Sequence, residues 1–211
     1  LFWDSKMHLE AWREYSKNLR GTAFTDEEMR EYMFGRTNED IVKYLIGKQP
    51  DKQLVLKCQN EKEAIYRQMC ADDKENVKLA KGAVEFLNYL CENDIPHTIA
   101  TMSEEVNVKF FIKEFGLEKW FDVSKIVYDN GKIKGKPEPD IYEIAAKNLE
   151  LQPQECIVVE DAVSGIESAR RAGIGKIVAI ESMETRELYS KLPAVNAIIA
   201  DFDEFNRDWL S

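Results

Sequence analysis

The sequence has little of what metal or disulfide frameworks need, with 2 histidines and 4 cysteines among 211 residues. The cysteines form no CxxC pair and no Cys/His ligand pattern, so we expect neither a zinc site nor a disulfide scaffold. We interpret them as reduced, small apolar side chains of a cytoplasmic protein. They are Cys58, Cys70, Cys91 and Cys156.

Long apolar runs and an excess of positive charge are also lacking. No run approaches the roughly 18 to 20 apolar residues that a membrane-spanning helix needs. The 29 Lys and Arg residues are outnumbered by 39 Asp and Glu, giving a net charge of -10. Because this field repels polyanions, we expect no nucleic-acid and no membrane partner. A small phosphorylated ligand stays compatible, since local basic groups can outweigh the overall charge.

The first third of the chain, from residue 7 to about residue 71, is helical in character. Thr25 with Glu28 three residues later is typical of a capping box, and Thr37 is placed to cap a further helix. One helix is expected through the apolar positions Leu9, Trp12, Tyr15 and Leu19, and three more at 26–34, 38–45 and 52–69. Four helices joined by short polar links indicate a small bundle.

After about residue 74 the pattern changes to helices that alternate with short apolar runs. Helices are expected around 83–90, 104–115, 139–149 and 165–172, and strands at 96–102, 125–128, 155–161, 176–180 and 194–201. The strand at 155–161 reads as buried. This alternation predicts an α/β fold with a mostly parallel sheet covered on both faces. Ligands of such sheets bind at the carboxyl ends of the strands.

Polar residues lie at the carboxyl end of the first of these strands. Thr101 supplies a hydroxyl beside the backbone amides of Met102 and Ser103, and Ser103 is placed to cap the next helix. Because a helix amino end carries partial positive charge, this stretch could bind a phosphate group. The alternative is that both hydroxyls serve only as caps.

Two further segments carry charge at strand ends. Lys136 lies between Gly135 and Pro137, in a stiff turn that would hold its ammonium in one place; otherwise it is a solvent-facing lysine. Glu160 and Asp161 are the last residues of the strand expected to be buried, and paired carboxylates there are typical Mg²⁺ ligands. The alternative for the acids is an exposed loop.

The order and spacing of these segments, with GKPxPD and VEDAxxGIxxAxxAG as the most specific, resemble the haloacid dehalogenase superfamily of phosphotransferases. The helical insert is similar to the cap of its β-phosphoglucomutase-like branch. The resemblance implies a three-layer Rossmann-type core formed by residues 1–5 and 75–211, and a helical bundle cap at 6–74. It also implies a first-strand aspartate that attacks phosphorus and a second aspartate, two positions on, as general acid and base.

The resemblance also assigns roles to residues of this chain. Thr101 would hold a phosphoryl oxygen, and Lys136 would neutralise the nucleophile and the phosphate. Asp161, with Glu160, would hold Mg²⁺, Asp161 as the direct ligand. Such positive charge is needed because a phosphate dianion must approach an anionic nucleophile.

Four cap residues match substrate-side positions of the branch. His8 lies four residues before Trp12, and Lys62 lies four before Tyr66. Gly35 matches a cap loop that selects the substrate, and Arg36 is expected to supply a further contact there. Trp12 is interpreted as core, and the alternative for Lys62 is a solvated helix face. These matches favour a small phosphorylated metabolite such as a sugar phosphate as the partner. The resemblance to this branch also implies a monomer.

The DxDG motif that carries the nucleophile in this family is not found in the sequence. Counting back from His8 places Leu1 just after that motif, so we expect the native protein to extend upstream and Asp4 to lie in the linker to the cap. The predicted function is a Mg²⁺-dependent phosphomonoester hydrolase. The alternatives are a β-phosphoglucomutase-like isomerase and, if the nucleophile is truly absent, a catalytically silent binding protein.

Overall fold

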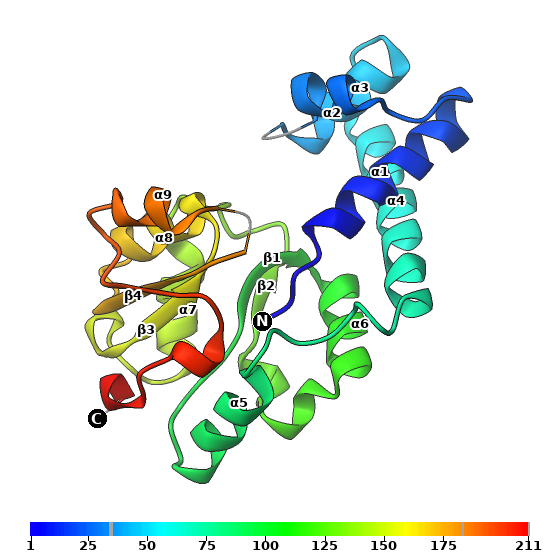
Figure 1. Ribbon diagram of the computed structural model, residues 1–211. Helices are drawn as coiled ribbons and strands as arrows, with labels where there is room; N and C mark the ends of the chain where they lie inside the picture. Colours follow the sequence, from blue (N-terminus) through cyan, green and yellow to red (C-terminus); the bar gives the residue numbers. More distant parts are fainter. Residues whose placement is uncertain (34–35, 183, 211) are drawn as a thin grey trace. The chain divides into compact units, whose positions relative to one another are not determined.

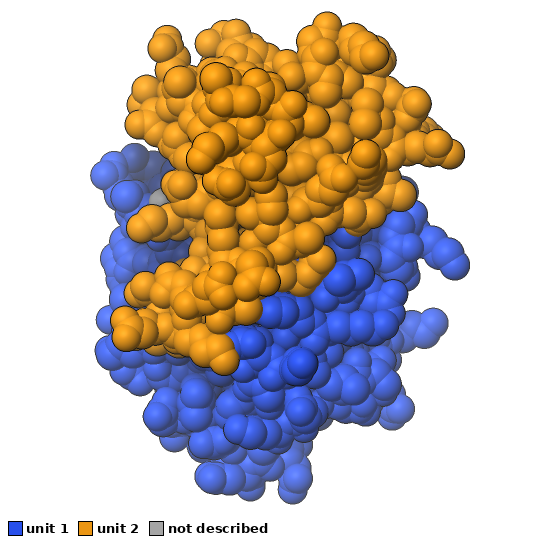
Figure 2. Space-filling model, turned by 90° about the vertical axis from the view of Figure 1, so that its right-hand side faces the viewer, with its two compact units in different colours: residues 1, 79–211 blue, residues 2–78 orange. Residues whose placement is uncertain are grey.

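The computed structural model describes residues 1–33, 36–182 and 184–210. The chain divides into two compact units, one formed by Phe2–Lys78 and the other by Leu1 with Leu79–Ser211. Figure 2 shows the two units in different colours. Within the described ranges, no helix combines the length and the apolar character that crossing a lipid bilayer requires.

The helical unit, Phe2–Lys78 (orange in Figure 2), is built from the four expected helices (Figure 1). They are α1 (Ser5–Arg20), α2 (Asp26–Tyr32), α3 (Asn38–Ile46) and α4 (Lys52–Asp72). The predicted capping box is confirmed, because Thr25 Oγ1 accepts from the backbone N–H of Glu28 and the Glu28 carboxylate accepts from Thr25 N–H. Thr37 caps α3 in the same way. Local side-chain chemistry therefore determines where these helices begin.

The core of the helical unit gathers apolar side chains from all four helices. Trp12 is 5% exposed and belongs to this core, as the sequence indicated. Ser16, on the same helix, is fully buried, and its hydroxyl accepts from the backbone N–H of Phe24 at 2.8 Å. Since α1 and α4 pack along each other, their facing side chains can form a site within this unit.

The α/β unit, Leu1 with Leu79–Ser211 (blue in Figure 2), alternates helices and strands. The helices are α5 (Ala83–Glu92), α6 (Glu105–Phe115), α7 (Asp140–Asn148), α8 (Val163–Arg171) and α9 (Arg186–Ser190). The strands are β1 (Ala100–Glu104), β2 (Val127–Asp129), β3 (Ile157–Glu160), β4 (Lys176–Ile180) and β5 (Ala197–Ile199). Parallel pairing joins β1 to β2, and β3 to β4 to β5. The predicted α/β class with a parallel sheet is confirmed.

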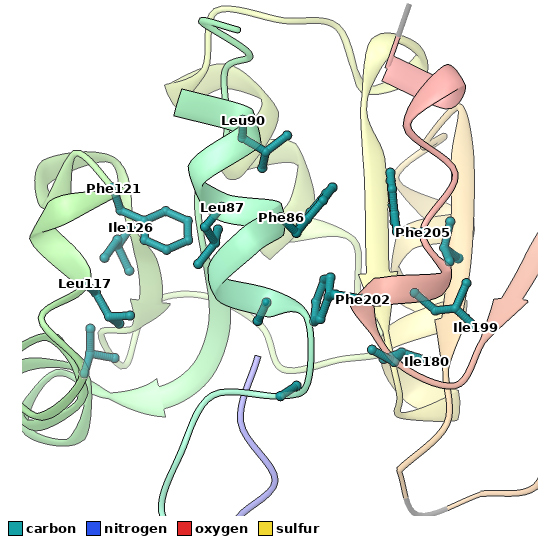
Figure 3. Close-up of a cluster of buried hydrophobic side chains, with 14 residues drawn as sticks. Phe86, Leu87, Leu90, Leu117, Phe121, Ile126, Ile180, Ile199, Phe202 and Phe205 are labelled. Atoms are coloured by element: carbon teal, nitrogen blue, oxygen red, sulfur yellow. The ribbon is translucent and has the colours of Figure 1, made fainter. Parts of the chain in front are cut away.

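Strand β4 is buried on both faces, which makes this unit three layers thick. Ile177 and Ala179 pack in one apolar cluster with α7 and α8, whereas Val178 and Ile180 pack in another with α5 and the carboxyl-terminal turns. Figure 3 shows the second cluster, in which the Phe86 ring lies 5.3 Å from that of Phe202. Side chains that alternate between two covered faces are typical of parallel sheets.

Two expectations about the strands are wrong in detail. Strand β1 continues through Glu104, so Ser103 lies in the strand and Glu104, not Ser103, precedes α6. Strand β3 is half-buried rather than buried. Among the described residues β3 pairs only with β4, which leaves its other edge without a partner strand and explains the exposure.

Candidate active site

Lys136 and Glu160 form an ion pair in the α/β unit. Lys136 lies in the loop between β2 and α7, and Glu160 is the last residue of β3. The Lys136 Nζ lies 2.8 Å from Glu160 Oε2, and the two side chains are only 14% and 11% exposed. Lys136 is therefore not the solvent-facing loop lysine that the sequence also allowed. A pair so removed from water is held by the fold rather than by chance surface contact.

The second acid, Asp161, has different partners. Its Oδ2 accepts from the hydroxyl of Ser182 at 2.5 Å, and its backbone carbonyl accepts from the Tyr189 hydroxyl at 2.6 Å. Burial, together with the nearby Asp161 charge, raises the pKa of Tyr189 to about 12, so its phenol stays a donor. The two acids thus point to separate neighbours although they are adjacent in the chain.

The hydroxyls at the end of β1 contact each other. Thr101 Oγ1 accepts from the backbone N–H of Ser103 and donates to the Ser103 hydroxyl, both at 3.1 Å. This bond within the strand replaces the helix cap predicted for Ser103. The Met102 side chain reaches toward Gly135, the residue before Lys136. The β1 end and the lysine loop are therefore neighbours in this unit.

His8 and Lys62 meet in the helical unit, from α1 and α4 respectively. Lys62 Nζ lies 3.0 Å from His8 Nδ1, and the His8 ring stacks on Tyr66 with 3.9 Å between centroids. Lys62 is 4% exposed, so the interpretation of this lysine as part of a solvated helix face is wrong. Because an ammonium can only donate, Nδ1 accepts, and the proton of a neutral His8 lies on Nε2.

Asp4 and Glu63 belong to the same cluster, and the sequence did not indicate either. Asp4 Oδ2 accepts from the Tyr66 hydroxyl at 2.6 Å and lies 3.4 Å from His8 Nε2. Burial alone would raise the pKa of Asp4, but the bonds from His8 and Tyr66 outweigh it, so this pKa lies below its usual value. Glu63 forms a short contact with Lys62. The signal available for Asp4 was its i, i+4 spacing to His8.

Of the two predicted cap-loop residues, Gly35 and Arg36, the structure describes Arg36. Arg36 is exposed, and its guanidinium lies 3.5 Å from the backbone carbonyl of Glu31. Within the part of the chain that the structure describes, the hydrogen bonds of Arg36 run to Glu31 and Met33 rather than to His8 or Lys62. Gly35, its predicted companion, lies outside the described residues.

The acidic pair fits Mg²⁺ only in part. Within 1–33, 36–182 and 184–210 no three His, Cys, Asp or Glu residues gather as a ready-made metal site. Mg²⁺ commonly uses one or two protein carboxylates and completes its shell with water and substrate phosphate. Asp161 meets this need because the Ser182 hydroxyl donates to Oδ2, and the other carboxylate oxygen, Oδ1, can bind the metal. The oxygens of Glu160 already accept from Lys136, Tyr142 and the Ala162 N–H.

Comparison with known proteins identifies the relatives of this chain. The family model described as haloacid dehalogenase-like hydrolase matches residues 4–179. A crystal structure of a HAD hydrolase, family IA, variant 3, from Entamoeba histolytica superimposes with a TM-score of 0.91 at 36% identity, over 100% of this chain and 92% of that one. A β-phosphoglucomutase structure from Clostridium difficile has a TM-score of 0.74 at 21% identity, covering 99% and 90%, and shares the fold.

A curated relative is similar over most of its length. The phosphorylated carbohydrates phosphatase of Thermotoga maritima is 27% identical over 174 residues, which is 82% of this chain and 77% of that protein. Other curated relatives are matched over shorter parts, down to 28% of the length of a bifunctional riboflavin kinase/FMN phosphatase from Arabidopsis thaliana.

Proposed function

We propose that this chain, which belongs to the haloacid dehalogenase-like hydrolases, is a phosphatase that releases inorganic phosphate from a small phosphate monoester, a sugar phosphate. The observation that carries the proposal is the partly buried Lys136–Glu160 pair at the carboxyl end of β3. Parallel sheets bind ligands at that end. The similarity to a phosphatase of phosphorylated carbohydrates supports the substrate class.

In the proposed reaction an aspartate oxygen bonds to phosphorus while the bond to the ester oxygen breaks, and the leaving oxygen takes up a proton. Water then attacks the phosphoaspartate and releases phosphate. By resemblance the aspartate lies upstream of Leu1, on a central strand of the sheet.

Each polar group at the strand ends has a role in this proposal. The Thr101 hydroxyl, with the amides of Met102 and Ser103, holds phosphoryl oxygens, and the Lys136 ammonium offsets the negative charge that meets there. Because this cation is fixed before the substrate arrives, little reorganisation is needed during the reaction. Its fixed position is the reason that a chain with an overall charge of -10 could bind a phosphate dianion.

The metal proposed for this site is Mg²⁺, with Asp161 as a direct ligand and Glu160 acting mainly through Lys136. When bound, Mg²⁺ would neutralise phosphoryl oxygens and help to orient them. Ser182 holds the Asp161 carboxylate in place for that purpose.

The helical unit is proposed to be a cap that selects the substrate. His8 and Lys62 would contact the part of the substrate beyond the phosphate, and Gly35 and Arg36 would form the selecting loop. The 3.0 Å contact between Lys62 Nζ and His8 Nδ1 supports this role, because it brings the two predicted substrate-side residues together in one polar cluster. Sugar hydroxyls are suitable partners for such a group.

A second candidate is a β-phosphoglucomutase-like isomerase, in which the sugar rather than water accepts the phosphoryl group. The His8–Lys62 contact also favours it, because both residues match the substrate side of that branch. Both reactions use the same phosphoaspartyl chemistry.

The proposed setting is a monomer in the cytoplasm. The cysteines are scattered along the chain without a CxxC pattern, which supports a reducing compartment. Size-exclusion chromatography coupled to light scattering tests the monomer, and a dimeric mass would contradict it.

The proposed function is tested by incubating the full-length protein with Mg²⁺ and a set of sugar phosphates, together with p-nitrophenyl phosphate as a generic ester. We expect phosphate release that EDTA abolishes and that Mg²⁺ restores. Absence of turnover with every ester, combined with tight binding of one of them, would instead support the silent binding protein.

A further inference from the structure

The hydroxyl of Tyr142 shares the Glu160 carboxylate with Lys136. It donates to Glu160 Oε2 at 2.6 Å, the same oxygen that lies 2.8 Å from Lys136 Nζ. Tyr142 comes from the first turn of α7, the helix that follows the lysine loop (Figure 1). The loop, the helix and the end of β3 therefore meet at one carboxylate oxygen.

The Tyr142 side chain has a fixed position. It is 4% exposed and belongs to the apolar cluster between α7, α8 and β4. Lys136 Nζ lies 5.1 Å from the centroid of its ring, within range of a cation–π contact. Burial and then the Glu160 charge hold the pKa of Tyr142 well above its usual value, so the phenol remains a donor.

The other side of Glu160 is equally constrained. Its Oε1 accepts from the backbone N–H of Ala162 at 3.2 Å. A Cβ on Gly165, in the first turn of α8, would collide with the Glu160 carboxyl group, so the helix packs directly against it. With α8 on one side and Tyr142 on the other, the carboxylate can take few positions.

We propose that Tyr142 is a positioning residue of the phosphatase site, whose hydroxyl orients Glu160 so that the carboxylate holds the Lys136 ammonium toward the substrate phosphate. This inference rests on the proposed function for its catalytic consequence. Its structural part stands separately, because it concerns only the hold on Lys136. A hydrogen bond to a charged group is strong enough to fix such a geometry.

The competing explanation is that Tyr142 only fills space in the apolar cluster. The two explanations differ in the hydroxyl, because a phenylalanine ring would fill the same space and keep the cation–π contact. Tyr142→Phe therefore removes the hydrogen bond alone. Tyr44→Phe is a matched control, since the Tyr44 hydroxyl donates to the Glu28 carboxylate at 2.8 Å in the helical unit, outside the proposed site residues.

The first readout is acylation of the folded protein by a short pulse of acetic anhydride, followed by peptide mass spectrometry. We expect Tyr142→Phe to raise the labelling rate of Lys136 several-fold relative to Lys134, the exposed lysine two residues earlier. General loosening of the loop would raise both rates together. The Tyr44→Phe variant should label like the wild type.

The second readout is steady-state phosphate release. We expect Tyr142→Phe to lower kcat about 10-fold to 100-fold, the range for a hydrogen bond to a charged group, while KM changes less than about twofold. Unchanged labelling of Lys136 relative to Lys134 would overturn the inference whatever the activity, and so would a kcat within twofold of the wild type. If the wild type hydrolyses no phosphate ester, the proposed function fails and the labelling alone decides the role of Tyr142.

Discussion

The two units each bury a lysine against a glutamate and beside a tyrosine ring. In the helical unit Lys62 is 4% exposed and pairs with Glu63, and its Nζ lies 5.8 Å from the Tyr66 ring. In the α/β unit Lys136 is 14% exposed and pairs with Glu160, 5.1 Å from the Tyr142 ring. The chemistry of the two pairs is alike.

The pairs differ in what they connect. Lys62 and Glu63 are neighbours on one helix, so their contact ties no separate segments together. Lys136 and Glu160 are 24 residues apart and join a loop to a strand end. The tyrosine hydroxyl also differs, because Tyr66 donates to Asp4 whereas Tyr142 donates to the lysine's own partner. The Lys136–Glu160 pair therefore joins two segments directly, whereas Lys62 reaches a second helix through His8 rather than through Glu63.

The largest effect should come from Lys136→Ala. We expect kcat to fall about 1,000-fold, because a fixed cation that stabilises the transition state is removed. Stability should also drop by about 3 kcal/mol, since Glu160 loses the partner of a largely buried pair. Phosphate release and urea unfolding measure the two effects, with Lys134→Ala as the exposed control. A kcat within tenfold of the wild type would remove Lys136 from the site.

Asp161→Asn tests the acid that follows Glu160 in the α/β unit. Replacing one carboxylate oxygen by an amide should raise the Mg²⁺ concentration for half-maximal activity about 10-fold to 100-fold. Isothermal titration of Mg²⁺ gives the same comparison without turnover. Asp122→Asn, a change in an exposed turn, should leave both values unaltered. Equal Mg²⁺ affinity in Asp161→Asn and the wild type would exclude Asp161 as a ligand.

Lys62→Met sharpens the comparison by removing the other lysine at nearly constant length. We expect KM to rise about 10-fold while kcat changes little, because a single charged hydrogen bond to the substrate is lost. Lys136→Ala should show the opposite pattern. The exposed Lys57→Met on the same helix is the control. If Lys62→Met lowers kcat and leaves KM unchanged, the two lysines do not divide their roles as proposed.

The smallest effect concerns acid stability of the helical unit. The N–H of Thr25, followed by bonds from Tyr44 and Arg20, lowers the pKa of Glu28 from 4.5 to about 2. A lowered folded pKa stabilises the fold above pH 4.5, and this contribution is lost as the pH falls toward 2. Glu28→Gln should therefore cost about 1 kcal/mol at pH 7 and little at pH 2. Urea unfolding at both pH values measures this, and an equal cost at the two would contradict it.

The sequence predicts best what local chemistry determines. Thr25 with Glu28, and Thr37, predicted where two helices begin, because a cap depends on residues three apart. The alternation of helices and strands predicted the parallel α/β unit. The family resemblance directed attention to Lys136 and Glu160, which the structure brings together.

What the sequence missed depends on contacts between distant segments. The sequence predicts Ser103 as a helix cap. In the structure the Ser103 N–H donates to the Thr101 hydroxyl, and the strand continues to Glu104. The sequence predicts that Asp4 lies in a linker, whereas in the structure its carboxylate accepts a hydrogen bond from Tyr66, 62 residues later. Nothing near Tyr142 in the chain reveals that its hydroxyl donates to Glu160, 18 residues later.

The most direct test follows β-glucose 1-phosphate and Mg²⁺ with the full-length protein by ³¹P NMR, which resolves the substrate, glucose 6-phosphate and inorganic phosphate in one sample. Water as acceptor predicts that inorganic phosphate rises from the start at the rate at which the substrate is consumed. Accumulation of glucose 6-phosphate ahead of free phosphate would contradict the phosphatase proposal and identify the sugar as the acceptor.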